Sequence, residues 1–494
     1  MMVGMHVDLR TKRHWLVGSG FILLFCLLLT FRLGWWEGRA PARHGAGDAQ
    51  PFLTARDDWF TISQEGRKIG YAHRTIAPTT TGYDLQEEVL LYINTMGVLQ
   101  PLHFQTAGSL DSRMRLTAFT FGLNSGLFRF NARGVVKGKL LHLQIGAPGE
   151  EKAAEIVLKE PLYLSAGVFE VSRLVGLQPG ENRTFHVFDP VAMGERPVTV
   201  SRADIDEFIL QDGKRKRVTK FALNFMGVTQ FAWVDAEGNI LREKGILGIV
   251  LERTIRREAL AGLDRLGSAD LTDLAAIPAN RVLENPAALQ ELQVRLSNLD
   301  AAVFSLDGDR QAWHKGVLRI RKKAAPNGKE RKIMGDNPAL KPGPLIQSDH
   351  PLIIGKAAEI IAAGDTDGEK AAKLMNWVYR QVKKRPVLSV PNALETLTNL
   401  VGDCNEHAML LAALARAAGI PAEVEAGLVY SRGKFYYHAW NALYLEGAWV
   451  TADAVLGQMP ADVTHIRFVR GAAERQMDLV GLIGRLHVEI VAAL

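Results

Sequence analysis

Cys404, His438 and Asp453 are residue types that together could attack a carbonyl group. A cysteine becomes a strong nucleophile when it loses its proton, an imidazole can accept that proton, and a carboxylate can hold the imidazole in one orientation. The chain has two cysteines, and the other, Cys26, lies in an apolar run. Neither a disulfide framework nor a cysteine-based zinc site can be built from them. The three residues therefore indicate a nucleophile, a base and an orienting acid.

Cys404 lies at the predicted start of a helix. Asp403 and Glu406 have the spacing of a capping box, an Ala- and Leu-rich run follows, and Gly419 and Pro421 mark the end of the helix. Unpaired N–H groups and the helix dipole stabilise a thiolate at such a position. We therefore expect the pKa of Cys404 to fall below its usual value of about 8.5.

His438 and Asp453 fall on a predicted β-hairpin. Its strands are Phe435–Leu445 and Ala448–Asp453, joined by a Glu-Gly turn. This register sets Trp440 opposite Asp453, and it sets His438 diagonal to Asp453 on the same face. Diagonal neighbours lie about 7–8 Å apart, which one hydrogen bond between the two side chains can bridge.

These motifs resemble the transglutaminase-like superfamily in its bacterial form. The resemblance covers about Ser348–Gly471 and rests on Gly402-Asp-Cys404, Gly419-Ile-Pro421, Tyr437-His438-Ala-Trp440-Asn and Trp449-Val-Thr-Ala-Asp453. It implies a papain-like α+β fold in which Cys404 is the nucleophile, His438 the base and Asp453 the orienting residue. Calcium dependence is not carried over, because the loops and added β-domains of animal transglutaminases are not recognisable here. Some members of the superfamily have lost catalysis.

Two further histidines lie near these motifs. His407 follows Cys404 by one helical turn, and packing or hydrogen bonding beside the site is favoured over contact with the thiolate. His465, in a Pro460–Ile466 segment similar to the tail of those domains, receives no role. One oxyanion donor is the backbone N–H of Cys404, by analogy with papain-like sites, and the second is not identified. A metal site through His407 and His438 lacks adequate ligand spacing, so no metal and no cofactor is expected.

The remaining chain divides into segments of different composition. We predict a cytoplasmic tail and transmembrane anchor at 1–36, a linker at 37–56, a β-rich domain at 57–258, a linker with a small β unit at 259–345, and the transglutaminase-like domain at 346–494. The fold class is thus predicted as α+β, with a papain-like core preceded by a β-rich domain and an N-terminal transmembrane helix.

The membrane prediction rests on Trp15–Phe31, which contains no charged residue and follows Arg10, Lys12 and Arg13. The alternative is a cleaved signal peptide ending near Ala40-Pro-Ala42, which lies far beyond the apolar run. An uncleaved single-pass anchor in the inner (plasma) membrane is favoured, with the bulk of the chain on the extracytoplasmic side.

The net charge of +6 does not indicate nucleic-acid binding, because Lys and Arg are spread along the chain without a recognition motif. The favoured function is a cysteine enzyme acting on amide or peptide bonds of an envelope protein or peptide through a thioacyl intermediate. Hydrolysis and transfer to an amine both remain open, and the oligomeric state is not encoded. The alternative is a non-catalytic envelope binding or scaffold protein with the same fold.

Overall fold

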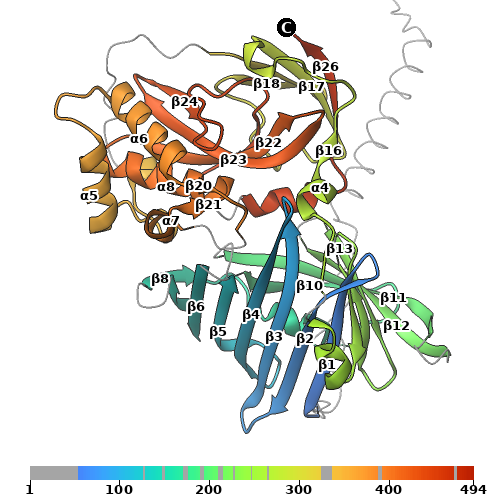
Figure 1. Ribbon diagram of the computed structural model, residues 1–494. Helices are drawn as coiled ribbons and strands as arrows, with labels where there is room; N and C mark the ends of the chain where they lie inside the picture. The colour runs from blue at the N-terminus through green and yellow to red at the C-terminus, as the bar shows by residue number, and fades with distance from the viewer. Residues whose placement is uncertain are drawn as a thin grey trace, which may run out of the picture. The chain divides into compact units, whose positions relative to one another are not determined.

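The computed structural model describes residues 54–494 except 126–127, 147–150, 171–175, 190–193, 210–214, 226–227, 246, 264–265, 324–336, 388–391 and 472–475. The described residues belong to one compact unit, Phe52–Leu494. They contain 26 strands and six α-helices, so the predicted α+β class is wrong for the chain as a whole. The described part is mostly β, with a smaller helical layer near the C-terminal end (Figure 1).

The predicted transmembrane helix receives no support from the described residues. None of their helices is long and apolar enough to cross a membrane. The segment on which that prediction rests, Trp15–Phe31, lies outside the described residues.

Fifteen strands of residues 56–254 form one sheet, in the order β8-β7-β6-β5-β4-β3-β2-β1-β15-β14-β13-β12-β11-β10-β9. Strands adjacent in this sheet pair antiparallel, including β1 with β15, except β9 and β10, which run parallel; β8 and β9 are the two edge strands. The strands are β1 (Arg56–Gln64), β2 (Arg67–Pro78), β3 (Gly82–Thr95), β4 (Val98–Asp111), β5 (Leu116–Ser125), β6 (Phe128–Lys137), β7 (Leu140–Gly146), β8 (Lys152–Val157), β9 (Leu162–Tyr163), β10 (Asn182–Asp189), β11 (Gly194–Ile209), β12 (Arg215–Phe225), β13 (Val228–Val234), β14 (Ile240–Lys244) and β15 (Ile249–Thr254).

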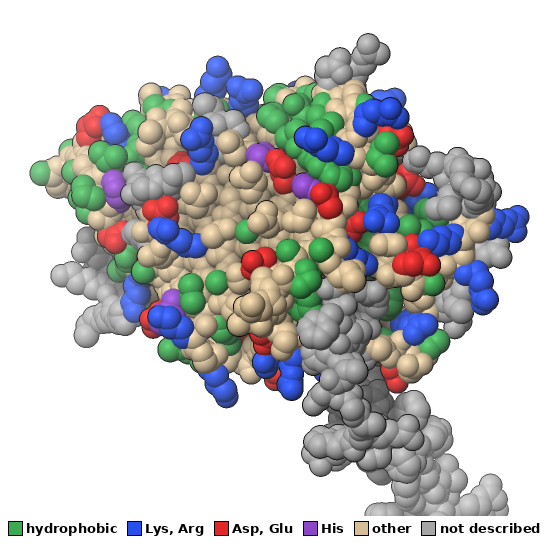
Figure 2. Space-filling view, turned by 90° about the horizontal axis from the view of Figure 1, so that it is seen from below, with side chains coloured by type: hydrophobic (Ala, Val, Ile, Leu, Met, Phe, Trp, Pro, Cys, Tyr) green, Lys and Arg blue, Asp and Glu red, His purple; other side chains and the backbone are tan. Residues whose placement is uncertain are grey.

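Alternation of apolar and polar residues explains this sheet. In β3, Tyr83 and Leu85 are buried whereas Asp84 and Gln86 are exposed, so one face of the strand packs and the other meets solvent. The sharp turn between β3 and β4 is Met96-Gly97, both with positive φ, as a two-residue hairpin turn requires. Figure 2 shows Lys and Arg side chains interspersed with Asp and Glu over one face of the molecule.

The C-terminal elements form a helical layer and three small sheets. The helices are α5 (Pro351–Ile360), α6 (Asp367–Gln381), α7 (Ala393–Asn399) and α8 (Cys404–Ala417); two shorter ones, α3 (Arg256–Leu260) and α4 (Leu271–Ala275), precede them. One sheet has the order β16-β23-β22-β25, with β24 paired to β23, a second has β18-β19-β17-β26, and β20 pairs with β21. Their strands are β16 (Ile277–Pro278), β17 (Glu291–Ser297), β18 (Gln311–His314), β19 (Val317–Arg321), β20 (Lys383–Lys384), β21 (Val401–Gly402), β22 (Ala422–Ser431), β23 (Lys434–Leu445), β24 (Ala448–Ala452), β25 (Ile466–Arg470) and β26 (His487–Ala493).

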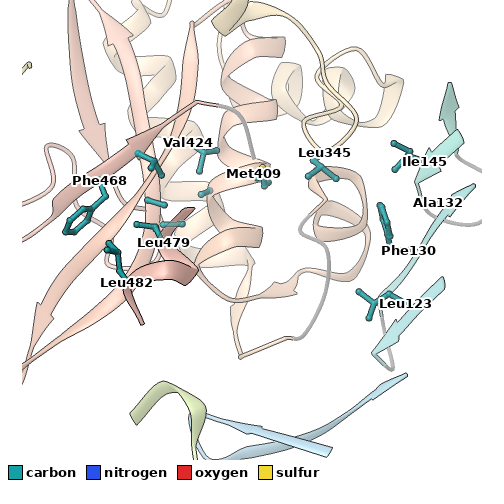
Figure 3. Packing of buried hydrophobic residues seen from close by; sticks show 14 of the residues in the cluster. Leu123, Phe130, Ala132, Ile145, Leu345, Met409, Val424, Phe468, Leu479 and Leu482 are labelled. Carbon is teal, nitrogen blue, oxygen red and sulfur yellow. The ribbon is translucent and has the colours of Figure 1, made fainter. Parts of the chain in front are cut away.

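Helix α8 is the centre of this part of the molecule. Every residue from 406 to 415 is buried, because Ala and Leu make the helix apolar around its whole circumference. It packs against α5, α6 and α7 and against β22 and β23. Figure 3 shows Met409 of α8 with Val424 of β22 on one side and Leu345 on the other. A helix fixed on all sides holds its first residue, Cys404, at a constant place.

Gly427 allows β22 to approach β25 closely beside the candidate site. It pairs with His438 on β23 and with Arg467 on β25, at a shift in the β22–β25 register. A Cβ at this position would lie 1.9 Å from the carbonyl oxygen of Ile466. A side chain here would therefore push backbone against backbone.

We predict that Gly427→Ala destabilises the chain by about 1–3 kcal/mol, the usual cost of overpacking. Gly355→Ala is the control: this residue lies inside α5 with open space around its Cα. That exchange is expected to stabilise by about 0.4–1 kcal/mol, because alanine restricts the unfolded chain. Thermal or urea unfolding measures both changes. Equal stability of the Gly427→Ala variant and the parent chain would contradict the close approach.

Candidate active site

The hairpin predicted from sequence is present in its predicted register. Leu445 pairs with Ala448 and Asn441 with Ala452, so Asp453 follows the last paired residue of β24. The His438 Nε2 and Asp453 Oδ2 atoms lie 2.8 Å apart. The structure therefore brings these two site residues into direct hydrogen-bond contact.

Asp453 is held on all sides. Its side chain has no exposed surface, and its Oδ1 accepts the backbone N–H groups of Val455 at 2.7 Å and Leu456 at 2.9 Å. Burial alone would raise the pKa of this carboxyl group, but hydrogen bonds from His438 and His465 hold it well below its usual range. Asp453 is thus an ionised, immobile acceptor.

Cys404 is the first residue of α8, as the capping pattern predicts. The Asp403 side chain accepts the N–H of Asn405 at 2.8 Å, and Glu406 Oε2 accepts the N–H of Asp403 at 2.9 Å. The backbone N–H of Ala439 donates to the Cys404 sulfur. Since Ala439 directly follows His438, the thiol lies beside the histidine strand. With Nε2 bound to Asp453, Nδ1 is the ring nitrogen of His438 available to a thiol proton.

The expected lowering of the Cys404 pKa is wrong. Burial raises the pKa of this thiol well above its ordinary value, and the negative charges of Asp403, Glu406 and Asp453 raise it further. Desolvation and three nearby carboxylates disfavour the thiolate more than the N–H groups and the dipole at the start of α8 stabilise it. The resting cysteine therefore carries its proton, and attack on a carbonyl requires a base to accept it.

His465 is part of this cluster, although no role was predicted for it from the motifs. Its Nε2 lies 2.9 Å from Asp453 Oδ2, the same oxygen that His438 contacts, and its Nδ1 lies 3.2 Å from Asp462 Oδ1. The side chain is fully buried. The contact with Asp462 is local and readable from their spacing, whereas the contact with Asp453 depends on how β25 returns to the sheet.

Trp440 forms a wall of the cluster. Its Nε1–H donates to Glu425 Oε2 at 2.6 Å, which satisfies a buried indole. Its ring lies 6.0 Å from that of His438 in a stacked arrangement and 5.1 Å from that of His465, edge to face. The indole therefore fixes the planes of both imidazoles.

His407 has a structural position, in line with the favoured interpretation. Its Nδ1 lies 2.6 Å from the carbonyl oxygen of Asp403, and the residue is buried. Burial lowers its pKa, so the ring is neutral. It ties the first turn of α8 to the capping residue.

Three atoms of the cluster have the types that bind metal ions. The ligand atoms of His438, Asp453 and His465 all lie within 4.8 Å of one another. Both imidazoles, however, contact one carboxylate oxygen at 2.8 and 2.9 Å, which are hydrogen-bond distances. A zinc ion needs about 2.0–2.2 Å to each ligand atom and would have to separate these pairs. The arrangement suits two N–H donors on one ionised oxygen.

A cysteine at the start of a buried helix and a histidine–aspartate pair on an adjoining sheet are the residue types and positions that cysteine-type acyl transfer would use. Residues 354–454 match the model of the transglutaminase-like superfamily. This range contains Cys404, His438 and Asp453. The family match is thus confined to this range, where the motifs indicated it.

Three solved structures are similar to parts of the chain. They are a proposed cysteine protease from Cytophaga hutchinsonii (18% identity, TM-score 0.27, 40% of this chain and 81% of that one), a β-barrel-like protein from Brucella abortus (8%, 0.31, 41% and 95%) and a proposed protease from Parabacteroides distasonis (12%, 0.19, 52% and 67%). At these TM-scores the likenesses carry no argument. No curated protein sequence matches the chain.

Asp403→Asn tests the electrostatic account of the thiol. Asparagine caps a helix as well as aspartate does, so the start of α8 should persist while one negative charge is lost. We expect the pH midpoint of Cys404 alkylation by iodoacetamide to fall by about half a unit. Mass spectrometry of the Cys404 peptide measures it separately from Cys26. An unchanged midpoint would show that the Asp403 charge does not act on the sulfur.

The loss of folding stability at low pH should reveal the lowered pKa values of two buried carboxyl groups, Asp453 and Asp462. Burial opposes ionisation of Asp462 as well, but hydrogen bonds from His465 and Thr464 hold its pKa, like that of Asp453, far below the unfolded value of 3.8. Their stabilisation is therefore present above that value and is lost as the pH falls toward the folded-state pKa. Thermal unfolding followed from roughly pH 5 to pH 3 should show a smaller loss in Asp462→Asn than in the parent chain, by about 1 kcal/mol. Parallel losses in both proteins would contradict the pKa assignment.

Proposed function

We propose that the chain is a cysteine enzyme that acts on amide or peptide bonds through a thioacyl intermediate. The observation that carries the proposal is the contact of His438 with the fixed Asp453 carboxylate, beside a cysteine whose sulfur accepts the Ala439 N–H. The proposed nucleophile, base and orienting group thus come from three neighbouring elements, which supports the proposal.

The proposed first step joins substrate and enzyme covalently. The thiol proton of Cys404 passes to Nδ1 of His438 while the sulfur attacks the carbonyl carbon of an amide. Asp453 accepts the Nε2–H of His438 and so favours the tautomer with Nδ1 free, and it stabilises the imidazolium that forms. The carbonyl π electrons move to oxygen, where the backbone N–H of Cys404 is the proposed donor.

In the second step the intermediate collapses to a thioester. The C–N bond breaks, and the leaving amine or ammonia takes the proton from His438. Water or a second amine then attacks the thioester, gives a proton to His438 and releases the Cys404 thiol. Whether the acceptor is water or an amine depends on how well the occupied site excludes water, so hydrolysis and acyl transfer belong to one proposal.

An envelope location is a further part of the proposal. It rests on the charge-free segment Trp15–Phe31 and the basic residues that precede it. Attachment there to the plasma membrane would expose the site to envelope proteins and peptides, which we propose as substrates. Fractionation of cells, with protease accessibility of the C-terminal part, tests both the attachment and the side of the membrane.

The raised thiol pKa supports one alternative. A cysteine that keeps its proton suits a domain that retains the fold without catalysis, as in an envelope binding or scaffold protein. The two functions differ in whether His438 controls the reactivity of Cys404.

The decisive measurement is mass-spectrometric trapping of an acyl adduct on Cys404 from a library of envelope-derived peptides, with full-length protein. The parent chain should form the adduct and Cys404→Ser should not form a thioester. His438→Gln should form it about 10²–10⁴-fold more slowly, the usual contribution of general acid–base catalysis.

Asn298→Gln, outside the site, is the control and should react at the parental rate. The scaffold alternative replaces the enzyme if no peptide forms an adduct and iodoacetamide alkylates Cys404 equally fast with and without His438.

A further inference from the structure

His465 is a buried histidine with a carboxylate oxygen at each ring nitrogen. Nε2 faces Asp453 Oδ2 at 2.9 Å, and Nδ1 faces Asp462 Oδ1 at 3.2 Å. A neutral imidazole has one N–H and one lone pair, so it can donate to only one of two ionised carboxylates. The second contact would then set the lone pair of a fully buried ring against a negative oxygen.

Neither carboxylate is arranged to supply the missing proton. Oδ1 of Asp453 accepts two backbone N–H groups, and Oδ2 accepts from His438. Oδ1 of Asp462 accepts the N–H and the hydroxyl of Thr464, at 2.8 and 2.6 Å, and its Oδ2 accepts the amide of Gln458. Both carboxylates are surrounded by donors, as ionised groups are. The ring must therefore provide both protons, which makes it an imidazolium.

The electrostatics agree with this geometry. Burial alone would lower the pKa of His465, but the hydrogen bonds and charges of Asp453 and Asp462 raise it above its ordinary value. On β23, His438 and the indole of Trp440 face the ring. Arg310 donates to the carbonyl oxygens of Ala461, Asp462 and His465, so its charge binds the backbone behind the ring and not the two carboxylates.

The segment 461–465 is built to keep the ring in place. It is buried throughout, and Arg310 fixes three of its carbonyl groups at 2.6–3.1 Å. His465 then leads directly into β25, which pairs with β22. A ring anchored at its backbone and at both nitrogens cannot leave Asp453 without breaking several hydrogen bonds.

We propose that His465 is a positioning residue: a fixed imidazolium that shares Asp453 with His438 and places a permanent positive charge behind the Cys404–His438 pair. It holds the Asp453 carboxylate toward the His438 ring. Its charge also offsets part of the negative field of Asp403, Glu406 and Asp453 at the sulfur. This inference rests on the proposed function for the role of His438, but the charge of His465 can be measured without any substrate.

Loss of this charge has a defined direction. Removing the cation makes a thiolate at Cys404 less favourable. It therefore moves thiolate formation to higher pH.

The test is the pH dependence of Cys404 alkylation by iodoacetamide in the full chain, followed on the Cys404 peptide by mass spectrometry. His465→Gln should raise the midpoint by about one unit. His407→Gln is the matched control, because it replaces a buried but neutral histidine beside the same cysteine and should leave the midpoint in place. A midpoint that is equal in His465→Gln and the parent chain, or that rises equally in both variants, would overturn the proposal.

A second measurement does not depend on the variant folding. In protein labelled with ¹⁵N-histidine, the parent chain should show two slowly exchanging ring N–H signals from one histidine with the nitrogen shifts of an imidazolium, up to a pH above the ordinary histidine range. Lone-pair nitrogen shifts for every buried histidine at neutral pH would overturn the proposal.

Failure of the proposed function is recognised separately. If the proposed function is wrong, His438→Gln does not change the alkylation of Cys404. If only the His465 proposal is wrong, alkylation of Cys404 still depends on His438.

Discussion

A single carboxylate oxygen, Oδ2 of the fully buried Asp453, receives hydrogen bonds from two histidines. An ionised carboxylate is costly to bury unless each oxygen is satisfied, and here four donors satisfy it: two rings and two backbone N–H groups. The local fold around the site follows from this requirement. The chain must turn sharply after β24 to present its N–H groups, and it must return through β25 to bring His465 to the other side.

The same requirement connects the site to its surroundings. Trp440, which orients both imidazoles, needs a partner for its indole and finds Glu425 on β22. Glu425 in turn is paired with Arg467 and Arg470 on β25. Buried polar networks of this kind specify one arrangement, because a partly satisfied network is unfavourable. The sheet thus positions His438 through hydrogen bonds as well as through strand pairing.

Local patterns in the sequence predicted the parts of the site that depend on neighbouring residues. The capping residues fixed Cys404 at the first position of α8, and the Glu-Gly turn fixed the register of His438 against Asp453. The role of His465 depends on a contact between distant segments, which periodicity does not encode. The raised pKa of Cys404 depends first on burial, which periodicity does not encode either, although two of the charges that add to it, Asp403 and Glu406, are the capping residues themselves. The fold class was wrong for a related reason: the motifs describe only the C-terminal part, whereas fifteen strands of one sheet precede it.

The charges around the sulfur determine what kind of nucleophile Cys404 can be. Burial disfavours a lone thiolate at Cys404, and the charges of Asp403, Glu406 and Asp453 disfavour it further. A thiolate is stable there only while its proton remains nearby on His438. The Cys404 thiolate and the His438 imidazolium therefore form together and are neutralised together. The reactive unit in the proposed enzyme is then the Cys404–His438 pair. In such a site Cys404 remains a neutral thiol until a substrate carbonyl is present for the sulfur to attack.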